Sequence, residues 1–166
     1  CTDERSFEKI ELTDLVPFQR MIDYGIAGVM AAHVVYPRVD PKPAGFSRVW
    51  LQKILRTELQ FEGCIFTDDL NMQGAGVQYC ETILQRAQAA LSAGCDMILV
   101  CNNAEGADEV LNGLQWNMSA TSISRLACMH AKNHFGSMIK LRGQEDYVQA
   151  VREISSIGHR NEEVAL

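Results

Sequence analysis

The sequence predicts an α/β fold in which parallel strands alternate with helices. An amphipathic helical segment, a glycine, an apolar strand and a polar loop follow one another repeatedly, with Gly25, Gly63 and Gly94 at the helix ends. Strands that alternate with helices pair in parallel through right-handed crossovers. An open doubly wound sheet and a closed (β/α)8 barrel both satisfy this pattern. A barrel typically needs about 250 residues, so in a barrel roughly the first half would be missing from these 166 residues.

Each helix is predicted by an apolar stripe at helical spacing and by residues suited to its ends. Thr13 can cap the first helix and Ser47 the second. Glycines end the first three helices, because glycine readily takes the backbone conformation that follows a helix. In chain order we expect helices at residues 13–24, between Ser47 and Gly63, and at 81–93, 105–114, 122–134 and, more weakly, 145–157.

Three apolar segments between these helices predict the strands. They are residues 26–35, 64–70 and 95–101, each preceded by a glycine and followed by a polar loop. Three prolines predict irregular structure at 36–45, and glycines mark 71–76 as a loop.

The composition is that of an ordinary globular protein with one substantial core, since 47% of the residues are apolar and 22% are charged. A net charge of −6 with scattered basic residues argues against a nucleic-acid or anionic-membrane surface. No apolar run approaches the roughly 20 residues of a membrane span. The chain begins at Cys1 without a signal peptide, which hints at truncation.

The six cysteines follow no disulfide-framework or metal-ligand spacing. The nearest approach to a zinc motif, Cys128 with His130 and His134, lacks a second pair of cysteines. We therefore expect no metal and no other cofactor, reduced thiols that behave as small apolar side chains, and a cytoplasmic location.

Two aspartates, Asp68 and Asp69, end the second strand, at the edge of a parallel sheet where ligands and catalytic groups collect. A carboxylate there can act as a nucleophile, a base, a metal ligand or a phosphate acceptor. Because side chains alternate along a strand, only one of the pair can point into a barrel mouth, and the other is suited to capping the next turn. Spacing alone does not choose between them.

The other strand ends carry residues that also have ordinary structural explanations. His33 is as typical of a hydrogen-bonded structural residue as of a ligand, and Met30 by itself is more typical of a core. Asn102 and Asn103 are good turn formers and need no further role. The remaining histidines are expected on the surface of the C-terminal helical part: His130, His134 and His159.

Four segments together resemble the bacterial β-N-acetylglucosaminidases of glycoside hydrolase family 3. They are residues 28–37 (GVMAAHVVYP), 40–44 (DPKPA), 66–72 (FTDDLNM) and 93–103 (AGCDMILVCNN). Several separate segments in the right order seldom match by accident. The resemblance covers about residues 1–130. It implies that residues 1–115 are the C-terminal half of a (β/α)8 TIM barrel, followed by extra C-terminal helices and a polar tail at 116–166.

The resemblance implies a retaining hydrolase that removes terminal N-acetylglucosamine from muropeptides during peptidoglycan recycling. In the family the first aspartate of the Ser/Thr-Asp-Asp-Leu motif is the nucleophile, which here is Asp68, and Asp69 is left as structural. Met30 matches a methionine near the sugar, and His33 adjoins it as a second substrate-binding candidate. The full-length enzyme is expected to be monomeric.

The sequence also departs from the family pattern. The acid/base histidine lies in a Lys-His-Phe-Pro-Gly-His-Gly motif well before the strand-end methionine, and neither it nor the residues that grip the sugar occur here. The chain alone is therefore expected to be inactive, since general acid–base catalysis contributes about 10²- to 10⁴-fold. One alternative is a non-catalytic barrel remnant that serves as an interaction module. A phosphate-accepting signalling domain fits less well, because no lysine lies at a strand end.

Overall fold

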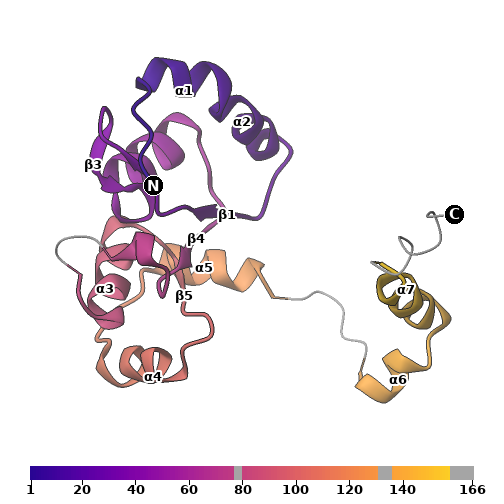
Figure 1. The fold of residues 1–166 in the computed structure, drawn as a ribbon. Helices are drawn as coiled ribbons and strands as arrows, with labels where there is room; N and C mark the ends of the chain where they lie inside the picture. Colours follow the sequence, from indigo (N-terminus) through magenta and orange to yellow (C-terminus); the bar gives the residue numbers. More distant parts are fainter. Residues whose placement is uncertain (77–79, 131–135, 158–166) are drawn as a thin grey trace, which may run out of the picture. The chain divides into compact units, whose positions relative to one another are not determined.

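The structure is a computed structural model that describes residues 1–76, 80–130 and 136–157 (Figure 1). The chain divides into two compact units, Cys1–His130 and Ala131–Leu166. The first unit contains a parallel sheet with the strand order β1-β4-β5. Its strands are β1 (Gly28–Ala31), β4 (Cys64–Asp69) and β5 (Met97–Leu99). The predicted α/β fold with parallel strands is confirmed, whereas the domain boundary after residue 115 stays a prediction.

Helices separate the strands along the chain, as predicted (Figure 1). α1 (Phe7–Thr13) was not predicted from the sequence, and the first expected helix, at 13–24, is α2 (Leu15–Asp23). Pro17 lies in its first turn, where a missing N–H breaks no hydrogen bond within the helix. The second expected helix has π-helical hydrogen bonding, and Ser47 caps it by accepting a hydrogen bond from the Trp50 N–H. The helices of this unit are α1 (Phe7–Thr13), α2 (Leu15–Asp23), η2 (Val49–Glu58), α3 (Ile83–Ala93), α4 (Ala104–Gly113) and α5 (Ala120–Cys128).

The prediction of irregular structure at 36–45 is wrong. β2 (Val35–Tyr36) and β3 (Asp40–Pro43) form an antiparallel pair, followed by the short 3₁₀ turn η1 (Ala44–Phe46). Pro41 and Pro43 are tolerated because they lie in β3, an edge strand, where a missing N–H can face away from the partner. A second 3₁₀ turn, η3 (Gln73–Ala75), lies in the loop after β4.

One face of the parallel sheet is packed and the other is partly open. Ile65 and Thr67 of β4 are fully buried, and the core continues into the apolar sides of η2 and α3. On the other face Met30, Phe66 and Met97 lie side by side in the strand register. Met30 is 53% exposed and Met97 is 37% exposed. This face of the sheet therefore presents a partly exposed apolar row, which crosses β4 two residues before Asp68.

The second unit contains two short helices, α6 (Met138–Arg142) and α7 (Glu145–Ser155). The second agrees with the expected helix at 145–157, and the first was not predicted. The predicted helix at 122–134 is α5 of the first unit, and His130 after it is exposed as expected. His134 and His159 lie outside the described residues. In the part of the chain that the structure describes, no helix combines the length and apolarity needed to cross a membrane.

Candidate active site

The acidic pair lies at the carboxyl end of β4, the central strand of the sheet. β1 and β5 flank this strand on either side (Figure 1). Residues of the loops that follow all three strands contact Asp69. Both aspartates are half-buried. In α/β folds this edge is where ligand-binding and catalytic groups are found.

The pairing between β4 and β5 shifts register immediately before the acidic pair. Phe66 is opposite Met97 and Asp69 is opposite Leu99, so β4 contains one more residue than β5 over this interval. The Thr67 hydroxyl accepts a hydrogen bond from the Leu99 N–H at 2.9 Å and so supplies a partner within the shifted stretch. Such irregularities redirect side chains and are frequent beside active sites. Strict alternation therefore does not describe this strand end.

The Asp69 carboxylate is committed to two backbone N–H groups. Its Oδ1 accepts from Asn71 in the loop after β4 and from Cys101 in the loop after β5, both at 2.9 Å. The Asp69 carbonyl accepts from His33 Nε2 at 3.1 Å and from the Met72 N–H at 3.1 Å. Asp69 thus has the turn-capping contacts that were expected of one aspartate of the pair.

The Asp68 carboxylate is far less engaged. Its Oδ1 accepts a hydrogen bond from the Asp69 N–H at 2.9 Å. Within residues 1–76, 80–130 and 136–157 it has no other hydrogen bond and no ion pair. This carboxylate has one oriented oxygen and one oxygen left for a ligand or a reacting atom.

Met30 and His33 have very different environments. The exposed thioether of Met30 belongs to the apolar row beside the acidic pair. His33 is only 5% exposed, and its ring stacks on Phe46 with a centroid distance of 5.3 Å. Its Nε2 must carry the proton, because the Asp69 carbonyl can only accept, and its Nδ1 has no partner in the described residues. Contacts of either side chain with a sugar stay predictions.

Two further contacts at this edge were not predicted from the sequence. The Asn103 amide donates to the Asn71 side-chain oxygen at 3.0 Å and links the loops after β4 and β5. Asn103 also caps α4 by accepting from the Gly106 N–H, and Asn102 takes a positive φ of 55°. The positive φ of Asn102 agrees with the turn-forming role expected of it, whereas Asn103 has capping and linking contacts beyond that role. The link between loops left no signal in the sequence, since its partners are 32 residues apart.

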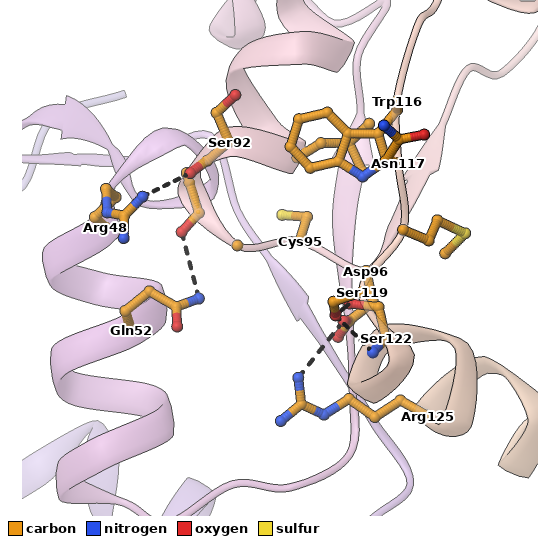
Figure 2. A pocket seen from close by; sticks show the side chains of 14 residues that line it. Arg48, Gln52, Ser92, Cys95, Asp96, Trp116, Asn117, Ser119, Ser122 and Arg125 are labelled. Carbon is orange, nitrogen blue, oxygen red and sulfur yellow. Dashed lines mark hydrogen bonds and ion pairs between the residues drawn. The ribbon is translucent and has the colours of Figure 1, made fainter.

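Two cavities lie at the other end of the strands, before β5 and before β4. The first, of about 340 Å³, lies between η2, the turn before β5 and the start of α5 (Figure 2). Arg48, directly before η2, and Gln52 of η2 donate to the carbonyls of Ser92 and Ala93 there. The second, of about 360 Å³, is lined by residues from Gly25 to Ala27, from Gln60 to Gly63 and from α5. Neither of these two cavities includes Asp68.

Comparison with known proteins places this geometry in a family. The profile of the glycosyl hydrolase family 3 N terminal domain matches residues 1–138. A protein named Beta-hexosaminidase from Nitrosospira multiformis is 51% identical over 164 residues, which are 99% of this chain and 46% of that protein. A protein of the same name from Methylobacillus flagellatus is 51% identical over 156 residues, 94% of this chain and 44% of its own.

Solved structures agree. NagZ from Neisseria gonorrhoeae in complex with N-trifluoroacetyl-D-glucosamine superimposes with a TM-score of 0.74 at 36% identity, over 93% of this chain and 43% of that one. The beta-N-acetylglucosaminidase from Thermotoga maritima gives 0.64 at 26% identity, over 80% and 32%. The chain spans less than half the length of these relatives.

Proposed function

Because the chain belongs to glycosyl hydrolase family 3, we propose that it carries the nucleophile of a retaining β-N-acetylhexosaminidase and that this nucleophile is Asp68. Membership confirms the predicted resemblance and the fold class, part of a (β/α)8 barrel. The observation that carries the proposal is the contrast between the two aspartates. Asp69 is bonded to two backbone N–H groups, whereas Asp68 keeps one carboxylate oxygen without a partner in the described residues.

In the proposed reaction the Asp68 carboxylate attacks the anomeric carbon while the leaving-group oxygen takes a proton. Water then attacks the same carbon and releases Asp68. The acid for the first step is proposed to come from outside these 166 residues, since the family's acid/base histidine motif does not occur in them. His33 is a poor substitute, because it is buried and its Nε2 is hydrogen-bonded to the Asp69 carbonyl. We therefore propose that the chain by itself does not hydrolyse glycosides.

The proposed substrate is a terminal N-acetylglucosamine residue of a muropeptide, released in the cytoplasm by a monomeric enzyme. The N. gonorrhoeae structure that resembles this chain holds an N-acylated glucosamine, which supports the sugar class. Met30 is proposed to line the sugar site, because it is 53% exposed and lies opposite Phe66, two residues before Asp68 in β4. The low exposure of His33 favours an indirect role for that residue.

The proposal can be tested in a chimaera in which this chain replaces the matching segment of the Nitrosospira multiformis relative. We expect the chimaera to cleave 4-nitrophenyl N-acetylglucosaminide and Asp68→Asn to lower kcat by about 10⁴-fold or more, as loss of a nucleophile does elsewhere. Its melting temperature should be unchanged. An Asp68→Asn variant that keeps a tenth of the activity would overturn the assignment.

A non-catalytic interaction module is the second candidate. The partly exposed row of Met30, Phe66 and Met97 favours it, because an apolar sheet face suits a protein partner. The same chimaera distinguishes the two, since a non-catalytic interaction module predicts a folded chimaera without hydrolase activity.

A further inference from the structure

We propose that Asp69 is a positioning residue that joins the loops after β1, β4 and β5 and thereby fixes the orientation of the Asp68 carboxylate. This inference rests on the proposed function of Asp68 and concerns how that carboxylate is held. Its evidence is the set of hydrogen bonds that converge on this one residue.

The Asp69 side chain ties the two loops on one side of the strand end. A single oxygen, Oδ1, accepts from the N–H of Asn71 and from that of Cys101, each at 2.9 Å. The first belongs to the loop after β4 and the second to the loop after β5. Truncation of the carboxylate would leave both N–H groups without this partner, and the two loops would lose their shared attachment.

The Asp69 backbone forms hydrogen bonds with the loop after β1 and with the Asp68 carboxylate. Its carbonyl accepts from His33 Nε2, which comes from the loop after β1. Its N–H donates to Asp68 Oδ1 at 2.9 Å. The direction of that N–H depends on the backbone angles of Asp69, which the three loop contacts restrain. The contacts of one residue thus set where the Asp68 carboxylate points.

His33 serves this arrangement as a rigid donor. The ring is buried, stacked on Phe46 and tilted only 12° from it, so its position is fixed by packing. A charged ring would place a second N–H at Nδ1, where no acceptor lies in the described residues. The neutral ring with its proton on Nε2 matches the Asp69 carbonyl. His33 therefore acts on the reaction through Asp69.

The consequence for catalysis follows from the geometry that a nucleophile requires. The attacking oxygen must lie within about 3–3.5 Å of the anomeric carbon and in line with the leaving group, and a displacement of about 1 Å costs about 10²-fold in rate. Loosening the strand end should therefore lower kcat while substrate affinity, which depends on other residues, changes little.

The chimaera tests this with a pair of substitutions at one position. Asp69→Ala removes Oδ1 and should lower kcat by about 10²-fold with KM within about threefold. Asp69→Asn keeps an oxygen in the Oδ1 position without the charge. It should recover most of the lost rate, because Oδ2 has no bond within the described residues. Asp108→Ala, at an exposed position of α4, is the matched control and should have no effect.

A second pair of variants tests the hydrogen bond from His33, in the loop after β1, to the Asp69 carbonyl. His33→Phe keeps the stacking on Phe46 and removes the donor, whereas His33→Gln offers an amide N–H in place of Nε2. We expect His33→Phe to lower kcat and His33→Gln to keep a kcat between that of His33→Phe and that of the unaltered chimaera. The rate of covalent labelling by a fluorinated N-acetylhexosamine should fall in parallel.

Each outcome supports or overturns the positioning role of Asp69. Equal losses in Asp69→Ala and Asp69→Asn would show that the charge is needed and would overturn the positioning role. Wild-type rates in Asp69→Ala and His33→Phe would overturn it as well, and His33→Phe decides alone if Asp69→Ala does not fold. If Asp68→Asn is active, the proposed function fails. If Asp68→Asn is inactive and Asp69→Ala is unimpaired, only the positioning role fails.

Discussion

Replacement of Asp96 tests the buried ion pair that connects the start of β5 to η2 and β4. Asp96 is 4% exposed. Its Oδ2 accepts from Arg56 Nη2 at 2.7 Å and from the Ile65 N–H at 2.9 Å, and Arg125 Nη1 lies 3.6 Å from its Oδ1. Burial lowers the pKa of Arg56, and the neighbouring Arg125 adds to this effect, whereas Asp96 opposes it.

The expected size of the effect follows from what Asp96→Asn leaves behind. Removing one partner of a buried pair typically costs about 3–5 kcal/mol. Arg56 keeps the carbonyls of Phe61 and Gly63, at 2.7 and 2.6 Å, and an asparagine oxygen can still accept from the Ile65 N–H. We therefore expect a loss near the lower limit, about 3 kcal/mol in the free energy of unfolding.

Urea unfolding of the 166-residue chain, followed by tryptophan fluorescence, measures this loss. The matched control is Glu58→Gln, which removes the partner of Lys53 from a pair 3.9 Å apart with side chains 38% and 71% exposed. That change should cost less than about 0.5 kcal/mol. An Asp96→Asn chain within about 1 kcal/mol of the unaltered chain would refute the reasoning, because the buried pair would then contribute no more than a surface pair.

Two further predictions concern buried groups of the first unit. Burial, with a smaller contribution from Asp96, raises the pKa of Cys95 from 9.0 to about 12. The thiol ionises at lower pH in the unfolded chain than in the folded chain, so the stability that is present below pH 9 should decline as the pH rises toward 12. Urea midpoints measured at pH 8 to 11 should therefore fall less steeply with pH in Cys95→Ala than in the unaltered chain. Ser47→Ala removes a buried acceptor of the Trp50 N–H and should lower the free energy of unfolding by about 1–2 kcal/mol. In the same urea assay Ser119→Ala, at the exposed cap of α5, should cause a smaller loss.

The order of helices and strands could be predicted because local chemistry determines it. Gly25 and Gly94 follow helices with φ of 81° and 122°, a conformation that favours glycine. At Gly63 a Cβ would lie 2.5 Å from the Ala27 carbonyl oxygen, so the close approach of the chain before β4 also requires glycine. Glycines that a turn or a close contact requires can therefore be recognised from the sequence.

The features that could not be predicted depend on contacts between distant segments. The pairing of β2 with β3 overrides the local effect of the prolines. The register shift at Thr67 appears only when β5 is in place. The bonds from Asp69 to His33 and to Cys101 cross 36 and 32 residues of chain. Alternation predicted that the two aspartates differ in role without choosing between them, and the structure shows the hydrogen-bond partners of each.

The most direct test of the proposed nucleophile is the position of a covalent sugar adduct. The chimaera would be incubated with a fluorinated N-acetylhexosamine that forms but only slowly loses the glycosyl-enzyme, then digested and sequenced by mass spectrometry. We predict an adduct on the Asp68 side chain that Asp68→Asn abolishes. An adduct on Asp69 or on any other residue would contradict the assignment.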